Sequence, residues 1–275
     1  MEPSQMVIMA VLAIVIVIAL FYLWKWLYGN SDMQDMVIYS SPSDGLPAKD
    51  KTAKVFSGTQ VPQIYAGGEY SISTWIYVTN WGINKGKNKP FLVLSGGSPE
   101  ASGVMTLVMY LGQYTNKLGV RVSVESADNK NGDLTFARDY AAIVAGTSPY
   151  TDSSPDFKKC DIEQVDLQKW VNITAVLTGR TIDIYIDGKL SRNCLLDGLF
   201  KVDGETPTLK LGGPDGFGGI IGMTRAANFA YSPDRVYSYY QEGPFAGFSF
   251  SSLDPGSYSL DIKRKGSTIF STSTE

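Results

Sequence analysis

An uninterrupted apolar run near the N-terminus places the strongest constraint on this chain of 275 residues. No charged residue occurs from Met6 to Trp24, and Tyr28 stands at the aromatic end of the run. About 20 apolar residues in a helix span the hydrocarbon core of a bilayer, and Trp and Tyr rings favour the headgroup region. The sequence therefore predicts one transmembrane helix over residues 6–28.

A cleaved signal peptide is the alternative interpretation of this run. Signal peptides have a basic start, an apolar core of about 7–15 residues and a small-residue cleavage site. The only charge before the run is Glu2, and bulky aromatic residues stand where small ones would be needed. A retained anchor is therefore favoured. Lys25 follows the run and no Lys or Arg precedes it, which favours a cytosolic main domain.

The composition excludes several classes of function. The chain has no histidine, which removes Ser-His-Asp triads, His-based acid–base catalysis and most catalytic zinc sites. Its net charge of −3 gives no field that would attract nucleic acid. We therefore expect a non-enzymatic protein with no nucleic-acid partner and no cofactor.

Strand signals dominate the chain after residue 54. Alternating or continuous apolar runs, separated by Gly-rich turns, predict strands at residues 70–78, 91–95, 105–110, 118–125, 170–177, 181–186, 189–194, 208–211 and 219–225. Asp187-Gly188 is a hairpin signal, and Ser232 before Pro233 predicts the start of one short helix. The predicted organisation is a linker and lead-in at 29–54, an all-β domain at 55–245 and a C-terminal extension at 246–275. Met36–Tyr39 could add an edge strand.

Several motifs in this all-β region carry a family resemblance. They are LQKW (167–170), IDIYIDGK (182–189), LGG (211–213), the segment 216–244, EYSISTWIYVTNW (69–81) and KNKPFLVL (87–94). In this order they resemble the laminin-G-like, concanavalin A-like jelly roll. The resemblance implies a jelly-roll sandwich preceded by one N-terminal transmembrane helix.

The anchor and the placement of the cysteines add to this resemblance. With them, the chain is similar to membrane-anchored laminin-G-like proteins of large DNA viruses of algae and amoebae, such as chlorella viruses. This implies a structural minor capsid protein of the virion, which links an inner membrane to the capsid shell through protein–protein contacts. Its partners would be the bilayer and capsid or other virion proteins, with the C-terminal domain facing the capsid.

Cys160 and Cys194 are the only cysteines. The predicted strand meander can bring them together, so a disulfide between them is one interpretation, and viruses of this group carry thiol oxidases. The alternative is two buried thiols in a reducing compartment.

A membrane-displayed lectin is the alternative function. Its glycan contacts would come from Trp81, Asn80 and Asn84. Laminin-G relatives also use loop oxygens to bind calcium, for which Asp128, Asp133 and Asp215 are the candidates.

Two further patterns are weaker. A hydrolase function would depend on Asp183 and Asp187, but the Asp-Gly turn uses Asp187, and the Glu-x-Asp-x-x-Glu pattern of glucanases is absent, since position 181 is Thr and no Glu follows at that spacing. Asn172 begins a glycosylation sequon inside a predicted inner strand.

Overall fold

The computed structural model describes residues 14–20, 23, 34–41, 43–96, 103–125, 134–147, 160–204, 206–245, 259–264 and 267–273. Residues 14–20 are helical. Within these ranges, no helix reaches the length and hydropathy of a membrane span. The predicted anchor residues Met6, Trp24 and Tyr28 lie outside the described residues.

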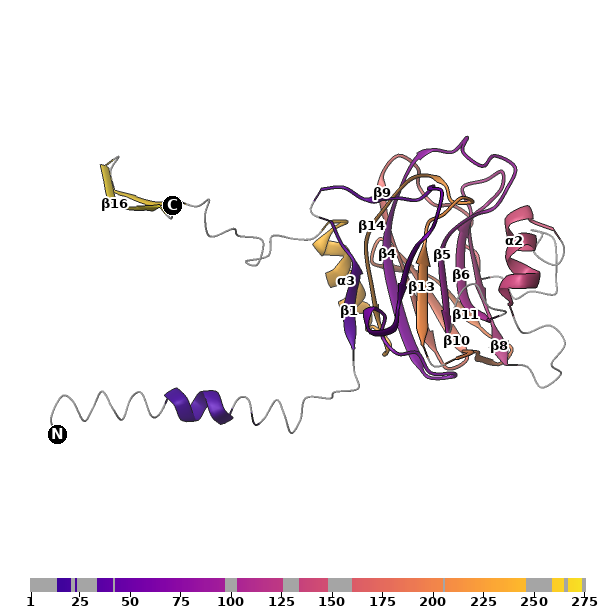
Figure 1. The fold of residues 1–275 in the computed structure, drawn as a ribbon, viewed down its shortest axis with the longest axis horizontal. Coiled ribbons are helices and arrows are strands. Elements are labelled where there is room, and N and C mark those ends of the chain that lie inside the picture. The colour runs from indigo at the N-terminus through magenta and orange to yellow at the C-terminus, as the bar shows by residue number, and fades with distance from the viewer. Residues whose placement is uncertain are drawn as a thin grey trace. The chain divides into compact units, whose positions relative to one another are not determined.

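A seven-stranded antiparallel sheet forms one layer of the protein (Figure 1). Its strand order is β1-β14-β4-β9-β10-β11, and β2 pairs with β14 at the side of this path. The strands are β1 (Asp35–Tyr39), β2 (Leu46–Pro47), β4 (Glu69–Asn80), β9 (Trp170–Thr178), β10 (Thr181–Ile186), β11 (Lys189–Leu195) and β14 (Gly218–Ala227).

A five-stranded antiparallel sheet forms the second layer, in the order β3-β13-β5-β6-β7. Its strands are β3 (Lys54–Ser57), β5 (Lys89–Gly96), β6 (Met105–Leu111), β7 (Leu118–Val122) and β13 (Pro207–Leu211). Two short pairs complete the strands: β8 (Val124–Glu125) with β12 (Leu199–Phe200), and β15 (Ser259–Arg264) with β16 (Ser267–Ser273). A 3-10 turn, η1 (Gly58–Gln60), follows β3.

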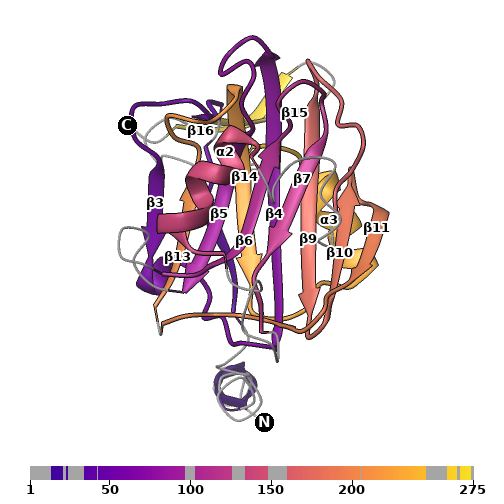
Figure 2. The same ribbon diagram turned by 90° about the vertical axis from the view of Figure 1, so that its right-hand side faces the viewer.

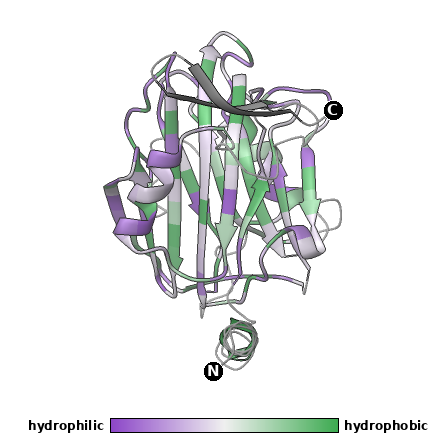
Figure 3. Cartoon of the chain, turned by 90° about the vertical axis from the view of Figure 1, so that its left-hand side faces the viewer, coloured by the Kyte–Doolittle hydropathy of each residue, from purple (hydrophilic) through white to green (hydrophobic). Residues whose placement is uncertain are grey.

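The main core lies between the two sheets. The alternation of each inner strand sends one set of apolar side chains inward, for example Ile72 and Ile76 of β4 against Leu92 and Leu94 of β5. Figure 3 shows this banding of hydrophobic and polar positions along the strands. The chain therefore folds as the all-β sandwich that the sequence predicts.

Helices cover the outer faces of the two sheets (Figures 1 and 2). The π-helical turn η2 (Phe136–Tyr140) and helix α2 (Ala141–Ala145) pack Ile143 on Val93, Met105 and Val108 of the five-stranded sheet. Helix α3 (Pro233–Glu242) packs Val236 on Val176 and Tyr185 of the seven-stranded sheet. Each sheet is thus buried on both faces over part of its area.

The strands follow the sequence prediction closely, while two features extend it. Helix α3 begins as predicted, since the Ser232 hydroxyl accepts a hydrogen bond from the Arg235 amide. Strand β1 is the edge strand that Met36–Tyr39 was expected to add, since it pairs with β14, whereas β2 lies within the range 29–54 assigned to a linker and was not predicted. The helical stretch at 136–145 was not predicted. It is only 10 residues long, which is too short for a helical repeat of apolar residues to be recognised.

A disulfide joins the two sheets at one open side of the sandwich, which confirms the predicted pairing of Cys160 with Cys194. The segment that starts at Cys160 extends the five-stranded sheet, because Ile162 forms an antiparallel bridge with Leu118 of β7. Cys194 belongs to β11, the edge strand of the other sheet. The bond therefore connects the edge of one sheet to the edge of the other.

Replacing both cysteines, Cys160→Ser with Cys194→Ser, should lower the free energy of unfolding by about 3–4 kcal/mol. The disulfide closes a loop of 34 residues in sequence separation, and cross-links of this length restrict the unfolded chain by that amount. Urea unfolding of the variant and the parent measures the difference. Reductant should lower the stability of the parent by a similar amount and leave the variant unchanged. A loss below about 1 kcal/mol would contradict the proposed role of the bond.

Candidate functional site

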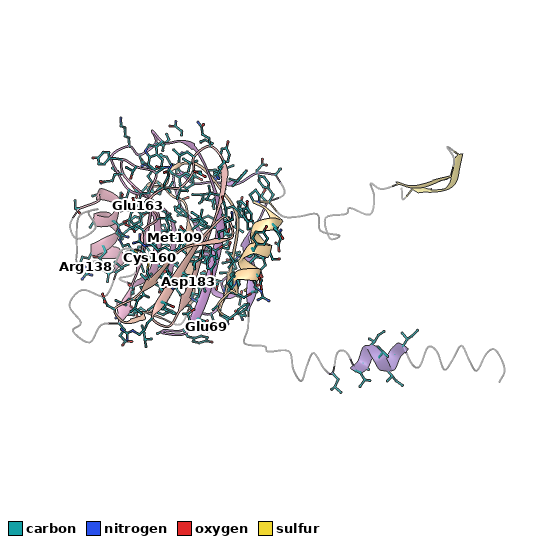
Figure 4. The ribbon with its side chains drawn as sticks, turned by 180° about the vertical axis from the view of Figure 1, so that it is seen from behind. Glu69, Met109, Arg138, Cys160, Glu163 and Asp183 are labelled. Carbon is teal, nitrogen blue, oxygen red and sulfur yellow. A yellow bond between two sulfur atoms is a disulfide. The ribbon has the colours of Figure 1, made fainter. Side chains whose placement is uncertain are left out.

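The pairing of the strands defines two opposite ends of the sandwich. Asp35, the first residue of β1, pairs with Ala227, and Glu69 pairs with Thr178, so these residues mark one end. We call this the proximal end, since the N-terminal segment joins the sandwich here. The other, distal end carries the loops at 81–88, 112–117, 166–169, 187–188 and 212–217. Figure 4 shows Glu69 and Glu163 at these opposite ends.

The three residues predicted to contact a glycan lie together on the distal loop that follows β4. Asn84 Nδ2 donates to the carbonyl oxygens of Pro214 at 3.0 Å and Gly216 at 2.8 Å. Asn80 Oδ1 accepts from the Gly82 amide at 2.8 Å. Trp81 is half-buried and packs against the core. The two asparagines thus hold the distal loops in place with these contacts.

Lys89 is a buried ammonium group beneath the same loop, and its side chain has no solvent exposure. Its Nζ lies 4.2 Å from the centre of the Trp81 ring. The amine donates to the carbonyl oxygens of Gly112 at 2.9 Å and Lys87 at 3.2 Å. Burial lowers the pKa of Lys89 to about 8. This cage of carbonyls and one aromatic ring connects the loop at 81–88 to the loop at 112–117.

Exposed apolar side chains also gather at the distal end. Tyr114 is 74% exposed at the tip of its loop, and Leu167 is 38% exposed on a neighbouring loop. Trp170 is half-buried on the outer face, where its ring lies 5.4 Å from that of Tyr77 and 5.3 Å from that of Phe245. None of these side chains was predicted from the sequence to bind a partner. The available signal was Tyr114, an aromatic residue in the polar segment 112–117 between two predicted strands.

The distal end also contains backbone in the left-handed region. Among the described non-glycine residues, positive φ occurs at Asn84 (51°), Gln168 (58°) and Asp187 (50°), all in distal loops. Asn and Asp adopt this region readily, and Asp187 with Gly188 forms the hairpin turn predicted from the sequence. Gln168 is the costly case, and such backbone is enriched at functional sites. These observations make the distal loops the candidate binding face.

The acids considered for calcium binding or hydrolysis are described in part. Asp215 lies in a distal loop, while Asp128 and Asp133 fall outside the described residues. Within the described part of the chain, no group of three potential metal ligands comes together. Asp187 accepts from the Asn172 amide at 2.9 Å, and Asp183 accepts from Asn193 on the next strand. Asn172 itself is fully buried.

Comparison with known proteins places the chain near no established family. No family model matches it, and no curated protein matches it. Among solved structures, it is similar to the binding domain of botulinum neurotoxin serotype D, with 12% identity and a TM-score of 0.46, over 76% of this chain and 46% of that one.

The binding domain of Paraclostridial Mosquitocidal Protein 1 is also similar, at 13% identity and a TM-score of 0.44, over 76% of this chain and 45% of that one. This chain thus spans less than half the length of these structures. Both TM-scores are below 0.5, so the function is proposed from this chain's own residues.

Stability should rise between about pH 8 and pH 10 because of Lys89. Below pH 8 the Lys89 amine is charged in both the folded and the unfolded protein, and burial of this charge destabilises the folded state. Above pH 8 the folded state loses this proton while the unfolded state keeps it up to about pH 10.4, so alkaline pH favours folding. We expect a gain of about 1–3 kcal/mol by pH 10, measured by urea unfolding at several pH values.

The variant Lys89→Met should remove this rise, whereas the control Lys87→Met, at an exposed neighbouring side chain, should keep it. An unchanged pH dependence in Lys89→Met would show that another group is responsible. Above pH 10 the raised pKa of buried tyrosines such as Tyr70 acts in the opposite direction, which sets the upper limit of the window.

Proposed function

We propose that this protein is a non-enzymatic connector, held in a membrane by residues 6–28, whose sandwich binds a protein partner through its distal loops. The observation that carries the proposal is the placement of the two attachments. The N-terminal segment joins the sandwich at Asp35, and the exposed aromatic loops lie at the other end of the same strands. A connector needs its two binding regions at opposite ends, so that both partners can be bound at once.

The more specific proposal follows the sequence resemblance. The chain would be a minor capsid component of a large DNA virus, in the laminin-G-like branch of the jelly-roll sandwiches. Its helix would lie in the inner membrane of the virion, and its distal loops would bind the capsid shell. Because the anchor confines the sandwich near the shell, weak contacts would act at high effective concentration.

The distal face has the composition of a protein-binding surface. Tyr114, Leu167 and Trp170 provide exposed or half-exposed apolar area, and aromatic residues dominate the energetics of protein interfaces. Three loops of this face, at 81–88, 112–117 and 212–217, are held together by hydrogen bonds of Lys89 and Asn84, so little flexibility is lost on binding. A catalytic role is not supported by the arrangement of Asp183 and Asp187, each of which is hydrogen-bonded within the sheet.

Liposomes that carry the full chain should retain purified capsid shell protein. The double variant Tyr114→Ser with Leu167→Ser should lower this retention about tenfold, as expected when central interface side chains are lost. Val37→Ser is the matched control, since Val37 is 50% exposed and pairs with Arg225 from β1, near the proximal end and away from the distal loops. Flotation of the liposomes, followed by quantification of the bound shell protein, measures the effect.

Two outcomes would overturn the proposal. Extraction of the chain from the liposomes by alkaline carbonate would show that residues 6–28 do not anchor it. Saturable binding to an oligosaccharide array, lost in Trp81→Ala, together with no retention of shell protein, would favour the lectin alternative.

A further inference from the structure

Three exposed apolar side chains stand at the proximal end of the sandwich, where none of the described strands and helices covers them. Tyr65 is 63% exposed, Leu195 57% and Leu199 43%. We call them the proximal apolar patch. Such side chains are costly to expose together, and apolar clusters on a surface mark contacts with proteins or membranes.

Backbone hydrogen bonds bring the three loops of this patch to one place. The Gly67 amide donates to the Phe200 carbonyl at 3.1 Å, and the Gly179 amide donates to the Gly68 carbonyl at 2.9 Å. Leu199 lies directly over Gly67, where an added Cβ would come within 3.0 Å of Leu199 Cδ1. The Leu196 amide bonds to the Arg180 carbonyl at 2.7 Å, which fixes the end of β11 beside the same turn.

The length of the connecting chain limits how far this end can be from a bilayer. Residues 29–34 separate the apolar run, which ends at Tyr28, from Asp35 at the start of β1. Fully extended, this connection spans at most about 25 Å. The strands are longer than this, since β4 alone has 12 residues and measures about 40 Å. If residues 6–28 lie in the bilayer, as proposed above, the chain length would keep Asp35 within about 25 Å of the end of the anchor, whereas the distal end would reach the bilayer only if the sandwich lay flat.

The geometry points to the lipid bilayer itself as the occupant of the proximal apolar patch, an inference that rests on the membrane anchor of the proposed function. The patch would insert Tyr65, Leu195 and Leu199 into the headgroup region. Strand β1 is at one side of the seven-stranded sheet and β11 at the other, about 24 Å away at the usual strand spacing. The anchor would thus hold one edge of the sheet and the leucines the other, and two supports fix the tilt. The distal loops then point away from the membrane.

The charges around the patch select the kind of lipid. Acidic side chains outnumber basic ones among the described residues of this end: Asp35, Glu69, Glu125, Asp197 and Asp203 against Arg180, Lys201 and Arg235. Attraction to anionic headgroups therefore gives no advantage, and the contact is apolar. We expect binding to zwitterionic phosphatidylcholine, weak dependence on salt and weaker contact with phosphatidylserine.

Hydrogen–deuterium exchange of the full chain in phosphatidylcholine nanodiscs tests this contact. The amides of residues 64–68, 178–181 and 195–200 should exchange at least about threefold more slowly in the discs than in an amphipol, which offers no bilayer surface. The triple variant Tyr65→Ser, Leu195→Ser and Leu199→Ser should lose this slowing. The distal variant Tyr114→Ser with Leu167→Ser should keep it. Leu195→Ser alone gives a partial loss and perturbs the fold least, and thermal unfolding verifies that each variant folds.

The outcomes separate this inference from the proposed function. A chain that does not remain with the discs refutes the anchor and thus the proposed function. A chain that remains with the discs but exchanges equally in disc and amphipol refutes the proximal contact alone. Slowing that requires phosphatidylserine would also refute it, because the contact would then be electrostatic. Slowing that grows with the number of chains per disc would assign the patch to a second copy of the protein.

Discussion

The short segment from Cys160 to Val165 is the constraint on which the closure of the sandwich depends. It continues the five-stranded sheet, through the bridge from Ile162 to Leu118 and the bond from the Val165 amide to the Asn116 carbonyl at 2.7 Å. Its first residue is bonded covalently to β11 of the other sheet. Without this segment, β7 would be an open edge of the five-stranded sheet, on the side of the core where β11 is the edge of the other sheet. Open edges expose both apolar surface and unpaired backbone groups.

Charge reinforces this segment from the outer side of β7. The Asp161 carboxylate accepts hydrogen bonds from the Arg121 guanidinium and from the Val120 amide at 3.1 Å, and the Lys117 ammonium lies 2.9 Å away. Burial alone would raise the pKa of Asp161, but Arg121 and Lys117 outweigh it and hold the pKa below its usual value. Such a buried pair adds little net stability, yet either partner left alone would be costly. The Asp161 ion pair therefore determines where the segment aligns with β7 and adds little to the strength with which it binds there.

The features that could be predicted from the sequence are those that depend on neighbouring residues. Alternation along 70–78 and the Asp187-Gly188 turn gave the central strands and their hairpin, and Ser232 gave the start of α3, because each signal acts within a few residues. The cage around Lys89 could not be predicted, since its acceptors at Gly112 and Lys87 are backbone carbonyls that any residue carries. Apart from Trp81, Asn80 and Asn84, the distal face was missed for a similar reason. Its loops lie far apart in the chain, and only the strand order places Tyr114 and Leu167 at one end.

The way residue 34 joins the sandwich at Asp35 would suit the connector role proposed above. Asp35 is held by the hydroxyls of Tyr231 and Tyr239, the first at 2.9 Å, and both lie near α3. From Asp35, β1 runs away from the proximal end along β14. A pull on residue 34 away from the sandwich therefore acts along the strand, and the hydrogen bonds of the β1–β14 ladder lie across it. All of these bonds resist together, whereas a pull from the side would open them one at a time. Attachment at the first residue of β1 thus resists force better along the strand than from the side. The contacts of Asp35 also prevent β1 from separating from its end.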